Sequence, residues 1–326
     1  MYLITVNTTD RKPILGSLVG QSAPQAAIEA TPIGRAVIKA FYNLEKYVKD
    51  KTGCEIQVVQ YQLMPEHFHG ILYIKEPLPS SFPLGQIIRA WKGECTRAYW
   101  RLSDTSSSDS TSPKADIRPR NTPLFESGFN DRPLSGQDQL KRWIAYLRDN
   151  PRRRWIKHHF PDRLRKVHQF RAGNTKHPYT AVGETLLVTF PERAQVRCHR
   201  HLTEEQIREE VARYMDLAHQ GKVLVSPFIS PAEKAVYDAC YAEQLPMIRI
   251  VNRALDGKFT YPSGRDFDGC VGGFMLVMAP YVEGDPKAAA RTITREGCLD
   301  LNDFAADLST EKAELTFRQG NVLRSR

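Results

Sequence analysis

The chain has 326 residues, of which 41% are hydrophobic and 25% charged, with a formal net charge of +9. That length suffices for two hydrophobic cores of ordinary size. The longest nearly uncharged stretch, residues 269–282, is well short of the roughly 20 apolar residues of a membrane helix, and no charged start precedes an apolar run. We therefore expect a cytoplasmic protein with no membrane partner. Six scattered cysteines without CxxC spacing argue against a zinc cluster or a disulfide framework.

The positive charge is concentrated in the first half of the chain. Residues 1–180 hold 28 Lys and Arg against 16 Asp and Glu, a net +12, whereas residues 181–326 hold 18 against 21, a net −3. A difference of this size predicts two domains with different partners, the first of which binds a polyanion and releases its counterions.

The first half predicts an α+β layer, with helices on an antiparallel sheet. The expected elements are, in chain order, a strand at 2–8, a helix at about 33–50, strands at 55–62 and 67–74, a helix at 84–101, a strand at about 128–134 and a helix at 137–150. A Ser-rich segment, 103–118, reads as a disordered surface insertion. We expect the first domain to cover 1–165, an irregular linker 166–184 and the second domain 185–326.

Two histidines stand at i and i+2 in the strand expected at 67–74. Because side chains alternate along a strand, His67 and His69 face one side, while Phe68, Leu72 and Ile74 face the other. Two imidazoles on one face can hold a metal ion while the opposite face packs into a core. Two histidines on a half-exposed strand are otherwise surface polar residues, so the pair is half of a candidate metal site.

The helix expected at 137–150 carries a second pair of chemically useful residues. Tyr146 and Asn150 are four residues apart and share a face at the edge of an apolar stripe. Pro151 cannot continue the hydrogen-bond ladder, so we expect the helix to end near Asn150. A tyrosine in this position either fills an amphipathic boundary or reaches a ligand.

Together these motifs resemble the REP-associated tyrosine transposases of the HUH single-strand endonuclease superfamily. The resemblance covers about residues 1–165 and rests on an ordered set of motifs. They are Tyr2–Thr8 followed by Arg11, Ile33–Val37, the MP-x-HxHG segment Met64–Gly70, Gln86–Lys92, and the helix ending Tyr-x3-Asn-Pro at Tyr146–Pro151.

The resemblance implies a ferredoxin-like HUH domain that cuts and rejoins single-stranded DNA, with Tyr146 as nucleophile and a 5′-phosphotyrosine intermediate. His67, His69 and Asn150 would be ligands of Mg²⁺ or Mn²⁺. Single-stranded or hairpin DNA would be the partner, and the protein would act as a monomer or as a homodimer. The residues expected to contact DNA phosphates are Arg89, Lys92, Arg97, Arg148, Arg152, Arg153 and Arg154.

Two positions depart from the family pattern. Glu66 stands where the family usually has Asn; strand alternation would turn it away from the histidines, so we expect little effect. Arg132 stands where the family often has His, which puts a catalytic or DNA-binding role for that position in doubt.

The second half predicts alternating strands and helices, typical of a parallel, doubly wound sheet. Capping signals open helices at Thr203 and Ser230, and apolar strands follow at 222–226, 247–251 and 274–278. The alternation and the Ser-Pro-Phe-Ile-Ser turn resemble the Rossmann-type domain of DNA-processing protein A. Because no GxGxxG or GxxxxGK[ST] is present, this resemblance names no nucleotide, and the serines serve either as helix caps or as ligand contacts.

Three functional hypotheses follow from these patterns. The first is a metal-dependent tyrosine endonuclease and strand transferase acting at hairpin-flanked sites, with the second half as an accessory domain. The second is a structured-DNA-binding protein without turnover. The third is a nucleotide-handling Rossmann-like protein with a DNA-binding attachment.

Overall fold

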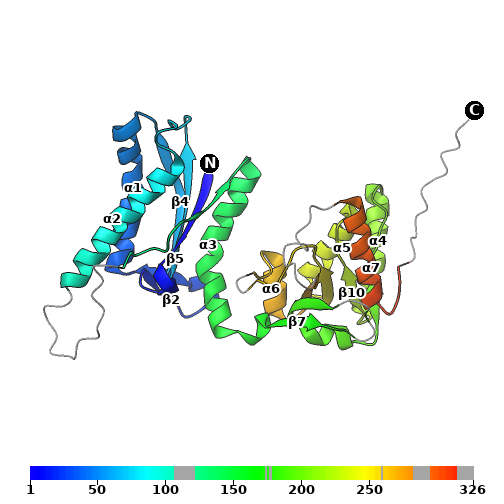
Figure 1. Ribbon diagram of the computed structural model, residues 1–326. Coiled ribbons are helices and arrows are strands. Elements are labelled where there is room, and N and C mark those ends of the chain that lie inside the picture. Colours follow the sequence, from blue (N-terminus) through cyan, green and yellow to red (C-terminus); the bar gives the residue numbers. More distant parts are fainter. Residues whose placement is uncertain (106–121, 173–174, 176–177, 258–259, 282–293, 314–326) are drawn as a thin grey trace, which may run out of the picture. The chain divides into compact units, whose positions relative to one another are not determined.

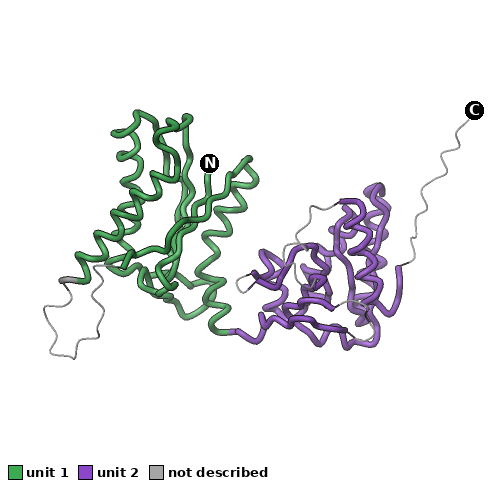
Figure 2. The backbone as a smooth tube through the Cα atoms, in the orientation of Figure 1, with its two compact units in different colours: residues 1–159 green, residues 160–326 purple. Residues whose placement is uncertain are grey.

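The computed structural model describes residues 1–105, 122–172, 175, 178–257, 260–281 and 294–313. The chain divides into two compact units, Met1–His159 and Phe160–Arg326 (Figure 2). Each unit is described separately. Within the described residues, no helix combines the length and the apolar composition needed to cross a membrane.

The first unit is built on a four-stranded antiparallel sheet, as expected. Its strand order is β4-β5-β1-β6. The strands are β1 (Tyr2–Asn7), β4 (Ile56–Met64), β5 (His67–Ile74) and β6 (Asn130–Pro133). The helices are α1 (Pro32–Thr52), α2 (Leu84–Thr105) and α3 (Gln137–His159). A hairpin of β2 (Gly16–Val19) and β3 (Ala27–Ala30), which sequence patterns did not predict, precedes α1.

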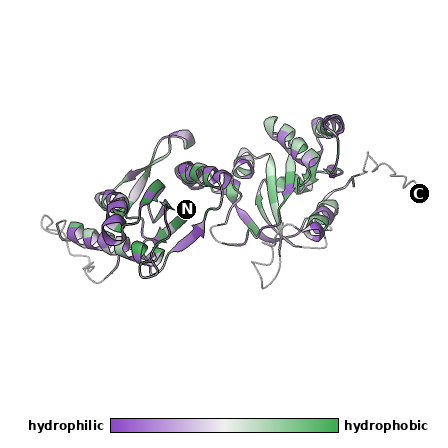
Figure 3. Ribbon diagram, turned by 90° about the horizontal axis from the view of Figure 1, so that it is seen from above, coloured by the Kyte–Doolittle hydropathy of each residue, from purple (hydrophilic) through white to green (hydrophobic). Residues whose placement is uncertain are grey.

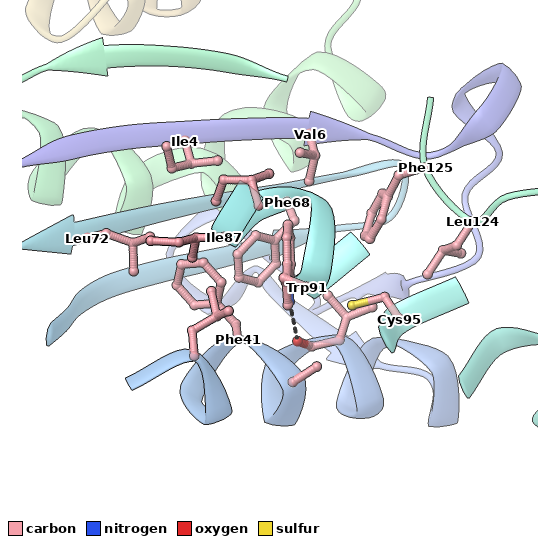
Figure 4. Packing of buried hydrophobic residues seen from close by; sticks show 14 of the residues in the cluster. Ile4, Val6, Phe41, Phe68, Leu72, Ile87, Trp91, Cys95, Leu124 and Phe125 are labelled. Carbon is pink, nitrogen blue, oxygen red and sulfur yellow. Dashed lines mark hydrogen bonds between the residues drawn. The ribbon is translucent and has the colours of Figure 1, made fainter. Parts of the chain in front are cut away.

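Helices cover both faces of this sheet (Figure 1). On one face, α1 and α2 pack against Ile4, Phe68 and Leu72 to form the main core, in which Phe41 and Trp91 are fully buried (Figure 4). On the other face, α3 packs against β1 and β5 in a smaller cluster. The buried members of that cluster are Leu3, Ile71, Leu134 and Leu147. The sheet is therefore the middle of three layers.

Gly70, the glycine of the HxHG motif, lies where the sheet meets α1. A Cβ atom at this position would stand 2.2 Å from Cζ of Phe41. The Phe41 ring is held edge-on by Phe68 at 4.8 Å and by Trp91 at 5.3 Å between centroids. The motif therefore ends in glycine because the Phe41 ring occupies the space that a side chain would need.

Helix α3 does not end near Asn150 as expected but continues through the buried Pro151 to His159. The proline removes one N–H from the helix ladder, which normally costs several kcal/mol. Contacts beyond the proline hold the last two turns in place: Trp155 Nε1 donates to the Gly20 carbonyl at 3.1 Å, and Arg154 forms an ion pair with Glu66 at 2.6 Å. Tertiary contacts thus override a local stop signal.

The second unit contains a six-stranded mixed sheet of order β7-β8-β12-β11-β10-β9. Its strands are β7 (Lys166–Phe170), β8 (Tyr179–Gly183), β9 (Arg193–Gln195), β10 (Val223–Ser226), β11 (Met247–Ile250) and β12 (Met275–Pro280). The four strands β9 to β12 are parallel, whereas β7 and β8 pair antiparallel. The helices are α4 (Glu204–His219), α5 (Pro231–Ala242), α6 (Arg265–Gly272) and α7 (Arg295–Leu308). The central strands β10, β11 and β12 are largely apolar and buried (Figure 3).

Three expectations need correction. The segment 166–184 is not a linker, because it forms β7 and β8 of the second sheet, and the boundary between units falls after His159. The second sheet is mixed rather than wholly parallel. Residues 103–105 continue helix α2, while most of the Ser-rich segment, 106–118, lies outside the described residues.

Candidate active site

His67 and His69 point to the face of the sheet that α3 covers. Phe68 and Leu72 are buried in the core with α1 and α2, and Ile74 packs against that core, which confirms the predicted alternation. Ile71, two residues after His69, packs under α3. The two imidazole rings lie 4.7 Å apart between centroids. Both histidines therefore face the layer that carries Tyr146 and Asn150.

Two contacts fix how α3 runs over the strand. Leu147 packs in one cluster with Ile71, whereas Arg154 reaches Glu66, directly before β5. From Ile71 to His67 the strand advances about 13 Å, and from Leu147 to Arg154 the helix advances about 10 Å. The helix therefore runs opposite to the strand direction. Residues between Leu147 and Arg154 lie over the stretch between Ile71 and Glu66, which holds both histidines.

Asn150 lies in this interval and faces inward. The residue is 8% exposed, and its Nδ2 is buried without a hydrogen-bond partner among the described residues. An unsatisfied buried amide costs about 1–3 kcal/mol. Because the amide oxygen and nitrogen exchange places on a half turn of the side chain, the same site can present an oxygen to a bound ligand. Asn150 therefore has unused hydrogen-bonding capacity in the buried part of α3.

Tyr146 lies one helical turn before Asn150 and is 37% exposed. Its ring packs edge-on against Trp143 at 5.4 Å, and the Arg153 guanidinium carbon lies 5.8 Å from the ring centroid. Arg153 itself is only 6% exposed. The Tyr146 ring thus contacts both an indole and a buried guanidinium and remains partly exposed to solvent.

The polar surroundings of the histidines come from neighbouring strands. Thr5 lies opposite His69 in the β1–β5 register, and its Oγ1 is 2.8 Å from His69 Nδ1. Burial, together with the neighbouring His67, lowers the pKa of His69 to about 3. The ring is therefore neutral at physiological pH, the form in which imidazole binds metal ions. Thr5 is a positioning residue that the sequence motifs did not identify.

Glu66 lies beside His67, contrary to the expectation that it would face away. Strand alternation does not apply to it, because Pro65 and Glu66 form the turn between β4 and β5. Its Oε1 lies 3.3 Å from His67 Nδ1 and 2.6 Å from a terminal nitrogen of Arg154. Burial alone would raise the pKa of Glu66, but the contact with His67 and the charge of Arg154 outweigh it and lower that pKa to about 2. An ionised Glu66 therefore ties the histidine strand to α3.

The basic residues expected to contact DNA have different environments. The Lys92 ammonium donates to the backbone carbonyls of Glu126 and Gly128, so it fastens a loop. Arg152 pairs with Asp149, and Arg154 with Glu66. The exposed members of the set are Arg89, Arg97 and Arg148. Arg89 and Arg97 line a groove between α1 and α2, on the face of the sheet opposite the histidines.

Arg132 does not lie in register with His67 or His69 across the sheet. It lies opposite Leu3 in the β1–β6 register, and its guanidinium carbon is 5.2 Å from the Trp143 ring centroid. Asn130 instead lies opposite Thr5, which on its other side lies opposite His69. Arg132 therefore supports the Trp143 ring against which Tyr146 packs.

The candidate metal ligands are two imidazoles and one amide. No group of three or more His, Cys, Asp or Glu side chains that could hold a metal ion occurs within the described residues. A site at His67 and His69 would need a third protein ligand of another kind, for which the buried Asn150 amide is our candidate. Imidazole nitrogens and an amide oxygen suit a divalent cation that keeps open positions for water or substrate. The neutral His69 and the unsatisfied Asn150 amide fit this role.

Comparisons with known proteins show distant similarity only. No protein-family model matches the chain, and no curated protein does. Among solved structures, the chain is similar to a REP-associated tyrosine transposase bound to a REP hairpin, with 18% identity, a TM-score of 0.27, and coverage of 48% of this chain and 67% of that one. It is also similar to DNA processing protein A from Helicobacter pylori (17% identity, TM-score 0.34, 45% and 66% coverage). It is similar, too, to DNA processing protein A from Streptococcus pneumoniae, with 21% identity, a TM-score of 0.32, and coverage of 44% of this chain and 48% of that one.

Proposed function

We propose that the first unit is a metal-dependent endonuclease and strand transferase that cuts single-stranded DNA with Tyr146 as nucleophile. The observation that supports the proposal is that His67 and His69 lie on the face of β5 that α3 covers, while α3 carries the buried Asn150 and, one helical turn earlier, Tyr146. Neither element alone has the residues for this chemistry. The proposal includes a ferredoxin-like HUH fold for the first unit and a Rossmann-like accessory role for the second.

Different residues would bind the metal ion, orient its ligands and attack the phosphate. His67, His69 and Asn150 would hold Mg²⁺ or Mn²⁺, and Thr5 and Glu66 would orient the two rings through their contacts. When bound, the cation would supply charge neutralisation at the scissile phosphate. Arg153 would hold the Tyr146 ring in place through its contact with the ring, and Tyr146 would attack the phosphate.

The reaction we propose exchanges one phosphodiester for another. The Tyr146 oxygen forms a bond to phosphorus as the bond to the 3′ oxygen of the preceding nucleotide breaks. The phenolic proton leaves, and a proton is taken up by the departing 3′ oxygen. The products are a 5′-phosphotyrosine and a free 3′-hydroxyl. Because the number and kind of phosphodiester bonds are unchanged, a second 3′-hydroxyl can reverse the step and join strands without ATP.

The substrate assignment rests on charge and on accessibility. The net charge of +12 over residues 1–180 favours a polyanion. Tyr146 and Arg148 are both exposed on α3, where a DNA strand would have to bind. The resemblance of the sequence motifs to transposases that act at hairpins makes hairpin-flanked single-stranded DNA the substrate to test first.

A labelled hairpin oligonucleotide with single-stranded flanks tests the proposal. Incubated with the full chain and Mn²⁺ or Mg²⁺, it should give an adduct that survives denaturing electrophoresis and disappears with EDTA. Tyr146→Phe should abolish the adduct without weakening DNA retardation. Tyr42→Phe, at a tyrosine that is 50% exposed on α1, is the matched control and should leave the adduct unchanged.

Two results would contradict the proposal. Retardation of uncut DNA by the wild-type chain under all metal conditions would support the binding-only alternative. An adduct that persists in Tyr146→Phe would show that another residue attacks the phosphate.

A further inference from the structure

The second unit has a cavity at the carboxyl ends of its parallel strands. Its volume is about 360 Å³, and its walls come from the loop after β10, the end of β11, and helices α5, α6 and α7. Ligands of sheets with parallel strands commonly bind outside these strand ends. Pockets for small molecules occupy about 300–1,000 Å³, so this cavity suits a ligand at the small end of that range.

Positive side chains dominate the polar lining. Lys234, Arg249 and Arg253 line the cavity together with a single acid, Asp266. Asp266 is already engaged, because it accepts from Arg249 at 2.6 Å and from the Tyr237 hydroxyl at 2.9 Å. The lining therefore has an excess of two positive charges.

The two arginine side chains that contribute to this excess positive charge are partly buried. Arg249 lies over the Tyr237 ring at 4.9 Å, and its Nε is buried without a hydrogen-bond partner among the described residues. Burial, followed by the charge of Arg249, lowers the pKa of Arg253, and Asp266 only partly offsets this. Arg253 donates to a neutral partner, the Ser263 hydroxyl, at 3.3 Å. Arg249 and Arg253 both line the cavity and Asp266 pairs with Arg249, so a bound anion would offset the positive charge that remains.

Helix α5, which begins beside the cavity, does not supply the anion site. The Glu233 carboxylate, 3% exposed, already accepts from the N–H groups of Ile229 and Ser230. Ser226 accepts from the Phe228 N–H, and Ser230 caps the helix, so neither serine needs a ligand. Phe228 is held at a φ of 52°, an unusual conformation for a bulky residue, where it forms part of the apolar wall. The basic side chains are therefore the groups left to bind a ligand.

We propose that this cavity binds a small phosphomonoester of about the size of a nucleoside monophosphate. The excess of two positive charges matches the −1.5 to −2 charge of a phosphomonoester at pH 7. Arginine guanidinium groups bind phosphate oxygens in pairs. The apolar residues Phe228, Ile250 and Leu301 provide a wall for the uncharged part of the ligand. This site is independent of the chemistry proposed for the first unit.

Isothermal titration of the full chain with AMP, GMP, CMP and ribose 5-phosphate tests the proposal, with adenosine as the uncharged comparison. We expect one site per chain for at least one phosphomonoester and none for adenosine. Lys234→Gln and Arg253→Gln should each weaken binding about tenfold or more. Lys234 is exposed, so its variant should fold normally. Arg208→Gln on α4 removes an equal charge from an exposed position outside the cavity lining and should leave binding unchanged.

Three results would overturn the proposal. The first is the absence of heat with every phosphomonoester at millimolar concentration. The second is equal affinity for adenosine and AMP, which would exclude phosphate recognition. The third is binding of a single-stranded oligonucleotide that Lys234→Gln and Arg253→Gln abolish, with no binding of any mononucleotide, which would assign the cavity to a DNA strand. Tyr146→Phe should bind phosphomonoesters in the calorimeter as the wild type does. Failure of the cavity proposal and failure of the nuclease proposal are therefore distinguishable.

Discussion

Gly70→Ala should destabilise the first unit strongly, because the new methyl group would overlap the Phe41 ring. The added Cβ would lie 2.2 Å from Phe41 Cζ, and Phe41 is fully buried between Phe68 and Trp91. Overpacking of this kind costs about 1–3 kcal/mol, and a ring enclosed on both sides puts the cost near 3 kcal/mol. At a urea m-value of about 2 kcal/mol/M, the midpoint should fall by roughly 1.5 M.

Intrinsic fluorescence can follow this unit alone. All four tryptophans of the chain, Trp91, Trp100, Trp143 and Trp155, belong to the first unit. Urea titration monitored at the tryptophan emission therefore reports its unfolding without a contribution from tryptophans of the second unit. Gly85→Ala is the control, because a Cβ there meets no atom within 4 Å, and it should change stability by at most about 1 kcal/mol.

A double-mutant cycle sharpens the test. The methyl group and the Phe41 ring should compete for one space. The loss of unfolding free energy in the double variant Gly70→Ala with Phe41→Leu should therefore be smaller than the summed losses of the two single variants by at least about 1 kcal/mol. A Gly70→Ala protein with wild-type stability would refute the reasoning. The face of β5 opposite the histidines would then not pack on α1, and the orientation of His67 and His69 toward α3 would lose its support.

Two further predictions concern charges and thiols. Arg154→Leu should destabilise the first unit by about 1–3 kcal/mol at pH 7, because it leaves the half-buried Glu66 carboxylate without its arginine partner. The pKa of Glu66 is lowered from 4.5 to about 2, so the stability from this pair is fully present above pH 4.5 and is lost as pH falls toward 2. The urea midpoints of the variant and the wild type should therefore converge over that pH range. A midpoint difference that stays constant over the range would contradict the assignment. At pH 8, a thiol-specific reagent should label two cysteines of the folded chain rapidly, Cys54 and Cys298, because burial raises the pKa of the other four; rapid labelling of more than two would contradict their burial. Those four are Cys95, Cys198, Cys240 and Cys270.

The parts of the fold that local patterns determine could be predicted from the sequence. The facing of His67 and His69 followed from strand alternation, and the helix at Ser230 followed from its capping residues, which form a capping box. These features depend on residues within a few positions of each other. A sequence pattern therefore contains all the information they need.

The features that sequence reasoning missed depend on distant partners. Helix α3 passes Pro151 because Arg154 and Trp155 find partners 88 and 135 positions away. Residues 179–183 form a strand because β12, almost a hundred residues later, pairs with them. Glu66 contacts His67 because it belongs to a turn rather than to the strand. Local polarity and periodicity contain no record of such contacts.

Manganese binding tests the central claim most directly, since the claim is that one site is shared by β5 and α3. Electron paramagnetic resonance of the full chain titrated with Mn²⁺ should reveal one bound ion with nitrogen couplings from two imidazoles. His67→Ala and His69→Ala should each remove one coupling and weaken binding. Asn150→Ala should weaken binding about tenfold or more and keep both couplings. Mn²⁺ affinity unaffected by Asn150→Ala, or a bound ion without imidazole nitrogen, would contradict the account.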